Sequence, residues 1–207
     1  MTESVHQDMN HVFTIGHSNH PLDTFIGLLK QHGIEVLVDV RSQPHSRYSP
    51  QFDAPELKIS LPEAGISYLF LGRELGGRPE GEQFYDDDGY VLYSRIAETP
   101  LFHEGIARLE RGVEQYRVAV MCSEENPTGC HRRLLIGRVL GGKSVEVIHI
   151  RGDGRLQPED ELKAEERASS AEATQLRLFG SAPSEEKPWR STRSVSPREP
   201  QRPSSEP

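Results

Sequence analysis

Residues 116–140, YRVAVMCSEENPTGCHRRLLIGRVL, contain the pattern that decides the fold: an apolar run, a polar loop and an amphipathic helix in direct succession. This succession is the repeating unit of a parallel α/β sheet, in which a helix follows each strand. Both cysteines of the chain, Cys122 and Cys130, flank the loop, and Glu124, His131 and Arg132 lie beside them. The stretch therefore predicts a strand followed by a catalytic or anion-binding loop.

The rest of the first 150 residues repeats the alternation of short β-rich runs and helical patterns. Strands are expected at residues 12–15, 35–40, 67–71, 117–121 and 144–150. Helices are expected at residues 21–33 and 55–64, and from the cap Thr99 with Pro100 to about Gly112. Residues 72–90, rich in Gly, Asp and Glu, are typical of an insertion or lid loop. The pattern predicts one small α/β domain with a mostly parallel, about five-stranded sheet, flanked by helices in Rossmann-like layers.

A length of 207 residues favours one domain, which we place at residues 12–151 after a flexible N-terminus at residues 1–11. From residue 152 to residue 207, Pro, Ser, Glu and Arg dominate and aliphatic residues become rare. Such a composition buries too little apolar surface to offset the entropy of ordering, so we expect a disordered tail. One apolar island, QLRLF at residues 175–179, interrupts it.

Composition also limits the setting and the partners. There is no apolar run of about 18 residues and no secretory pattern at the start, so we expect a cytoplasmic protein that does not insert into membranes. Two cysteines in such a chain indicate thiols, metal ligands or a redox pair rather than a disulfide framework. The net charge of −8 opposes non-specific attraction to nucleic acid, so any such contact needs a local basic patch.

Ligands of α/β sheets bind outside the carboxyl ends of the strands, where this chain concentrates polar residues. The candidate anion- or substrate-binding residues there are His17, Ser18, Arg41, Arg47 and Arg132, and Asp39 is a candidate catalytic carboxylate. Simpler roles remain open for several of them. His17 and Ser18 fit a turn that caps the next helix, Asp39 fits an acceptor of loop amides, and the arginines fit solvated charges.

The cysteine loop is compatible with three kinds of site. Cys122 fits a buried strand-end residue that packs like a small hydrophobe. Alternatively, a helix start at Cys130 lowers a thiol pKa, so that a thiolate acts as nucleophile, His131 or Glu124 moves protons and Arg132 holds an anion. In the third case Cys122, Cys130 and His131 are zinc ligands and Glu124 is the base of a metal-assisted hydrolysis.

Four segments in order resemble one known family: TIGHSN at residues 14–19, VDVRSQPHSR at 38–47, LGRELGG at 71–77 and MCSEENPTGCHR at 121–132. Together they resemble the domain-of-unknown-function 488 family, DUF488, over roughly residues 13–150. The resemblance implies a small α/β domain and no particular reaction. Its motif positions include His17, Asp39, Arg41, Arg47, Cys122, Glu124, Cys130, His131 and Arg132.

A looser likeness connects the strand, cysteine loop and helix to rhodaneses and cysteine phosphatases. Those proteins use a tight Cys-x5-Arg cradle, whereas Arg132 lies ten residues after Cys122 and two glutamates intervene. Sulfur or phosphate transfer is therefore a secondary alternative.

The island in the tail is similar to the Gln-Leu-x-Leu-Phe peptide by which bacterial replication and repair proteins bind the DNA sliding clamp. Its contact residues are expected to be Gln175, Leu176, Leu178 and Phe179. An extended tether that presents apolar anchors suits such a groove. We therefore expect an enzyme, a hydrolase or transferase, that acts on nucleic acid or nucleotides in DNA repair or related metabolism. The alternative is a non-catalytic adaptor that binds a nucleotide or another anion.

Overall fold

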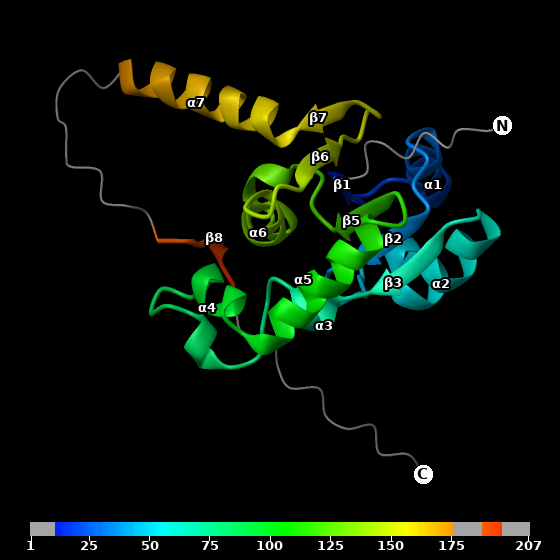
Figure 1. Ribbon diagram of the computed structural model, residues 1–207, viewed down its shortest axis with the longest axis horizontal. Coiled ribbons are helices and arrows are strands. Elements are labelled where there is room, and N and C mark those ends of the chain that lie inside the picture. The colour runs from blue at the N-terminus through cyan, green and yellow to red at the C-terminus, as the bar shows by residue number, and fades with distance from the viewer. Residues whose placement is uncertain (1–10, 176–187, 196–207) are drawn as a thin grey trace, which may run out of the picture.

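A computed structural model describes residues 11–175 and 188–195, which form a mixed α/β domain (Figure 1). Its described residues contain a six-stranded sheet in the order β3-β2-β5-β1-β6-β7. The strands are β1 (His11–Gly16), β2 (Val36–Asp39), β3 (Ser67–Phe70), β5 (Val118–Cys122), β6 (Glu146–Ile150) and β7 (Leu156–Pro158). All pairings are parallel except that of β6 with β7. The predicted mostly parallel sheet is confirmed, with β7 as an additional strand.

Helices cover both faces of the sheet. On one face α1 (Leu22–Gln31) and α2 (Ala54–Glu63) bury residues such as Phe25 and Leu57 in one apolar cluster. On the other, α5 (Pro100–Val113) and α6 (Arg138–Gly141) pack into a second cluster that contains Phe102 and Leu140. The predicted cap of α5 is confirmed, because the Thr99 hydroxyl accepts a hydrogen bond from the Phe102 amide. No helix in the described ranges is long and apolar enough to cross a membrane.

The expected lid loop at residues 72–90 is more ordered than its composition indicates. It begins with the short helix α3 (Gly72–Leu75), continues through a 3-10 turn at Glu82–Phe84 and ends in the strand β4 (Tyr90–Leu92). The helix α4 (Tyr93–Ala97) follows. The strand β4 pairs with β8 (Arg190–Ser194), which comes from the far end of the chain. A short helix, a 3-10 turn and a long-range strand pairing at its end therefore order the segment that was expected to be an insertion or lid loop.

The tail expected from residue 152 onward also requires correction. The strand β7, the helix α7 (Glu159–Gln175) and β8 all lie within it. Polar contacts supplement the burial of Leu162 in holding α7: Glu159 accepts hydrogen bonds from His149 and Arg133, and Glu166 pairs with Arg133. Counting aliphatic residues misses this source of order. The remainder of the tail, including residues 176–179 of QLRLF, and the N-terminus at residues 1–10 lie outside the described residues.

The end of β1 packs directly on the loop that follows β5. A Cβ atom added at Gly16 would lie 1.8 Å from the backbone oxygen of Glu124 and 2.7 Å from the Cα of Glu125, distances that no side chain tolerates. A residue without a side chain is therefore required where these two backbones meet.

We predict that Gly16→Ala lowers the free energy of unfolding by roughly 1–3 kcal/mol, because the loop after β5 must move to admit the methyl group. The matched control is Gly27→Ala on the exposed side of α1, where a Cβ meets nothing within 4 Å. This control should stabilise the protein by about 0.5–1 kcal/mol through helix propensity. Denaturant unfolding measures both, and a Gly16→Ala variant as stable as the wild type contradicts the packing described.

Candidate functional site

The parallel order places the carboxyl ends of β1, β2 and β5 side by side, and a pocket opens beyond them. Its volume is about 590 Å³. Residues after all three strands contribute to its walls, among them His17, Arg41 and Cys122, and the end of β8 completes it. The sequence-based expectation that the site draws on several strand ends thus agrees with the position of this pocket.

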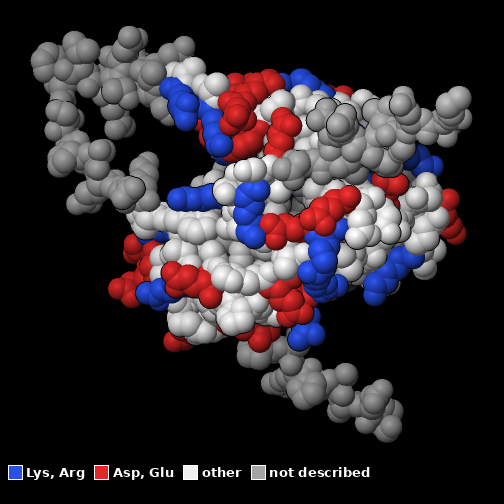
Figure 2. All heavy atoms as spheres, viewed as in Figure 1, with Lys and Arg blue, Asp and Glu red and all other residues white. Residues whose placement is uncertain are grey.

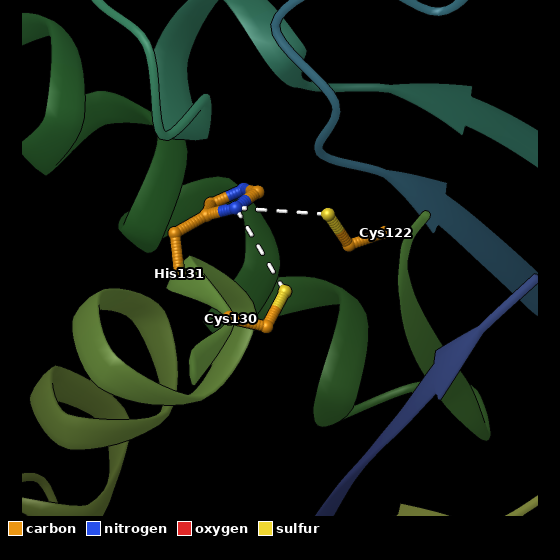
Figure 3. A group of neighbouring side chains, drawn as sticks. All are labelled: Cys122, Cys130 and His131. Carbon is orange, nitrogen blue, oxygen red and sulfur yellow. Dashed lines mark hydrogen bonds between the residues drawn. The ribbon is translucent and has the colours of Figure 1, made fainter. Parts of the chain in front are cut away.

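Cys122 and His131 line this pocket and form a cluster with the buried Cys130 behind them (Figure 3). Cys122 is the last residue of β5, and Cys130 and His131 follow a 3-10 turn at Pro127–Gly129. The Nδ1 atom of His131 lies 3.7 Å from the Cys122 sulfur and 4.0 Å from the Cys130 sulfur. Both sulfurs point toward the imidazole from opposite ends of the loop.

The orientation of the His131 ring is fixed by a hydrogen bond on the side away from the two sulfurs. Its Nε2 atom lies 3.0 Å from the carbonyl oxygen of Val40, which can only accept a hydrogen bond. Nε2 therefore carries a proton, and in the neutral ring the lone pair of Nδ1 faces the two sulfurs. Gly77 makes room for the ring, since a Cβ there lies 2.5 Å from the Cγ of His131.

The two thiols have opposite proton affinities. Donation from the Cys130 thiol is the main cause that holds the pKa of Cys122 well below the usual thiol range, and His131 adds to it against the effect of burial. Burial is the main cause that raises the pKa of Cys130. Burial, the largest single cause, lowers the pKa of His131, but Cys122, the Val40 carbonyl and Glu124 together raise that pKa above its ordinary value. Both shifts act in the same direction, because they favour negative charge on Cys122 and a proton on His131.

The residues after Cys130 continue as a π-helical turn, Arg132–Gly137, before α6 begins. The predicted helix start is therefore present, but its first turns are wider than those of an α-helix. Such turns inside helices are frequent at functional sites.

Arg41 is held rigidly in the wall of the pocket. Its Nε and Nη2 atoms donate to the two carboxylate oxygens of Asp39 at 2.9 and 2.7 Å, and Nη2 also donates to the Phe52 carbonyl. Its Nη1 atom donates to the Nε2 of His17 at 3.2 Å, which His17 can accept because its Nδ1–H bonds the Ser18 carbonyl. Burial is the main cause that lowers the pKa of His17, so the ring is neutral.

Asp39 is not open to the pocket. It is 0% exposed and accepts hydrogen bonds from the Arg41 side chain and backbone and from the Tyr68 hydroxyl. The structure thus places this candidate catalytic carboxylate as the counter-ion of Arg41.

Arg132 is likewise turned away from the pocket. It is 1% exposed, and it donates to the hydroxyl of Thr14 and to the backbone carbonyls of Glu124 and Glu125. These bonds fix the path of the loop between the two cysteines. The structure therefore gives Arg132 a supporting role in place of the expected direct contact with an anion.

Two other expected binding residues lie outside the pocket lining. Ser18 has a positive φ of 47° and uses its carbonyl to accept from His17 and Ser49. Arg47 is exposed, and its guanidinium lies 5.4 Å from the ring centre of Tyr48, which does line the pocket.

Arg78 and Arg193 are pocket residues that sequence reasoning missed. Both are exposed, and neither forms an ion pair with any residue in the described ranges. A hydrogen bond from the Arg78 backbone amide to the Ser42 hydroxyl positions Arg78, and Arg193 belongs to β8. No local motif marks either residue, because only the tertiary fold brings them to the strand ends.

The lining of the pocket has a different charge balance from the rest of the protein. On the face in Figure 2 acidic and basic side chains alternate, with acidic groups gathered over α7. The pocket instead contains Arg41, Arg78 and Arg193 against one carboxylate, Glu124, besides the Cys122 sulfur. Because Asp39 already compensates the charge of Arg41, the cationic groups of the lining without a described ion-pair partner are Arg78 and Arg193.

Comparison with known proteins places the chain in a family. Residues 21–139 match the family described as domain of unknown function DUF488. The chain is also 30% identical over 108 residues to a protein of Saccharum officinarum named probable cinnamyl alcohol dehydrogenase, and equally to one of that name from Zea mays. That similarity covers 52% of this chain but only 27% of each relative, so the chain spans about a quarter of their length. No solved structure matches. Because the family match covers more than half of the sequence, the protein belongs to the DUF488 family.

Proposed function

We propose that this DUF488 protein is an enzyme that acts on nucleotides or nucleic acid, with its reaction at the cluster of Cys122, Cys130 and His131. The observation that carries the proposal is that this cluster opens into the pocket lined by arginines. A substrate phosphate held by those arginines lies beside the sulfurs and the imidazole. Hydrolysis or transfer of a group next to a phosphate is the chemistry that this proximity favours.

Each charged residue of the pocket has a proposed role. Arg41 binds and orients the phosphate. Its side chain loses little entropy on binding, because hydrogen bonds to Asp39 and Phe52 already fix the guanidinium. Arg78 and Arg193 supply charge that no described carboxylate neutralises. Glu124, exposed in the pocket wall, acts as the proton acceptor.

Tyr48 supports a nucleotide as the class of substrate. Its side chain is 86% exposed, although it lies at the pocket and the neighbouring Arg47 stacks over its ring. An exposed aromatic ring beside cationic groups is suited to stacking on a base while the phosphate is bound elsewhere. A base of a single strand or of a free nucleotide is accessible for such stacking.

The dehydrogenase name of the plant relatives does not extend to this chain in our proposal. A dinucleotide-binding turn carries the pattern G-x-G-x-x-G after the first strand, whereas residues 16–21 read GHSNHP. The buried ring of His17 stacks on Phe52 at that position, with ring centres 4.4 Å apart.

We further propose that QLRLF recruits the enzyme to the sliding clamp and thereby to DNA repair or replication. Gln175 is the last residue of α7, and the other four residues of the peptide lie outside the described ranges. The support is the peptide sequence itself. Tethering raises the local concentration of an acidic protein near DNA that it binds poorly alone.

We predict that Tyr48→Ala and Arg78→Ala each weaken binding of a fluorescent single-stranded oligonucleotide about tenfold, through lost stacking and a lost phosphate contact. Matched controls are Tyr116→Ala and Arg111→Ala, which alter exposed residues of the same types that do not line the pocket. Fluorescence anisotropy at constant salt measures all four. Equal affinities for all variants and the wild type would exclude the pocket as a nucleic-acid site.

A second experiment distinguishes an enzyme from a non-catalytic adaptor. Nucleoside phosphates and oligonucleotides are incubated with the wild type and with Cys122→Ser, and the products are resolved by chromatography. We expect turnover by the wild type, and loss of turnover with retained binding in the variant. Binding without turnover by the wild type supports the non-catalytic adaptor. A covalent adduct at Cys122 supports the rhodanese- or phosphatase-like alternative.

For recruitment, we predict that replacing Leu178 and Phe179 by Ala abolishes capture of the full chain by immobilised sliding clamp. Arg177→Ala, at the variable position of the peptide, should retain capture and serves as the control. Loss of the apolar anchors removes the groups that enter a groove, whereas the variable side chain remains in solvent. Capture that is equal for both variants contradicts the recruitment proposal.

A further inference from the structure

The three donor atoms of the reactive cluster have the spacing of a metal site. The sulfurs of Cys122 and Cys130 and the Nδ1 of His131 all lie within 4.8 Å of one another. Tetrahedral zinc, with bonds of about 2.3 Å to sulfur and about 2.0–2.1 Å to nitrogen, separates these ligands by roughly 3.6 Å. The two observed sulfur-to-nitrogen separations, 3.7 and 4.0 Å, differ from this value by a few tenths of an ångström, and the two sulfurs lie within 4.8 Å of each other.

The surroundings of His131 support the same arrangement. A histidine that binds a metal usually donates its second ring N–H to a backbone carbonyl or carboxylate, which fixes the ring and the tautomer. His131 does this with Val40, at 3.0 Å. Its remaining nitrogen is thereby aimed at the two sulfurs (Figure 3).

The ligands are also held by the fold rather than by a flexible loop. Cys122 belongs to β5, His131 packs against Gly77, and Arg132 fixes the backbone between the two cysteines. A preformed site of this kind loses little entropy when it binds an ion.

We propose that Cys122, Cys130 and His131 bind a zinc ion whose fourth position opens into the pocket. Structural zinc sites are closed by four protein ligands, whereas catalytic sites use three and leave the fourth position to water or substrate. Within the described residues the cluster contains three ligands, and Cys122 and His131 also line the pocket. The inference deepens the proposed function and rests on it for the reaction alone, because zinc binding is measured without any substrate.

The first experiment measures metal in the full-length protein, purified without an affinity tag or chelator and kept reduced. Elemental analysis should find about one zinc per chain in the wild type and almost none in Cys122→Ser or His131→Ala. The matched control is His103→Ala, an exposed histidine of α5, which should retain the zinc. Circular dichroism and thermal unfolding confirm that each variant is folded.

A second experiment needs no variant at the site. Reduced wild-type protein is stripped with a chelator and titrated with Co²⁺, then with Zn²⁺. We expect thiolate-to-cobalt charge transfer, the intense visible bands of tetrahedral cobalt, and their displacement by zinc. Added azide should shift the visible bands, because it can enter an open fourth position.

The outcomes distinguish this inference from the proposed function. Reduced protein that takes up neither ion, or uptake that Cys122→Ser and His131→Ala leave unchanged, overturns the zinc site. Tight binding with no response to azide overturns the open position. Zinc bound at the cluster by a protein that binds no oligonucleotide and turns over no nucleotide refutes the proposed function but retains the metal site.

Discussion

The hydrogen bonds donated by the buried guanidinium of Arg132 are the interaction on which the site depends. A charge that is 1% exposed must find acceptors inside the protein, and here they are the Thr14 hydroxyl and two backbone carbonyls of the loop after β5. These bonds hold the middle of the loop from Cys122 to Cys130, together with the pairing of the Ser18 amide with the Ser123 carbonyl and the ion pair of Glu125 with Arg151. Gly16 contributes from the other side, since its missing side chain lets the loop approach the end of β1. The geometry of the cluster is thus set by the backbone around it.

The same interaction connects the site to the C-terminal helix. Arg132 donates to Thr14, the Thr14 hydroxyl lies 2.7 Å from Nδ1 of His149, and Nε2 of His149 lies 2.9 Å from Glu159 of α7. Burial is the main cause that lowers the pKa of His149, so the ring is neutral and every donor in this chain of bonds meets an acceptor. A fully satisfied buried polar network of this kind specifies one arrangement. It explains why residues with the composition of a tail are ordered against the sheet.

The strands could be predicted from the sequence because β-rich runs alternate regularly with helix signals such as Thr99 and Gly33. The sequence also predicts that Arg41 and Cys122 lie at the same edge of the sheet, because parallel strands bring their carboxyl ends together there. The adjacency of β2 and β5 comes from the strand order, which the sequence did not predict. The hydrogen-bond and ion-pair partners of individual polar groups could not be predicted from the sequence. Nothing local distinguishes Arg132, which is buried beneath the loop, from Arg78, which faces the pocket. That difference, like the pairing of β8 with β4, arises only from contacts between residues distant in sequence.

The arginines around the pocket differ in role because their charges are compensated in different ways. Arg41 and Arg132 are neutralised or saturated within the protein, by the Asp39 carboxylate and by carbonyl groups respectively, so they hold positions rather than attract a ligand over distance. Arg78 and Arg193 are exposed and have no described ion-pair partner, so the long-range attraction comes from them. One of these two lies on β8, a strand that joins the core only by pairing with β4 and through contacts such as that of Trp189 with the Leu134 carbonyl. The anion binding that we propose for the pocket therefore depends in part on a segment outside residues 21–139, which match the family.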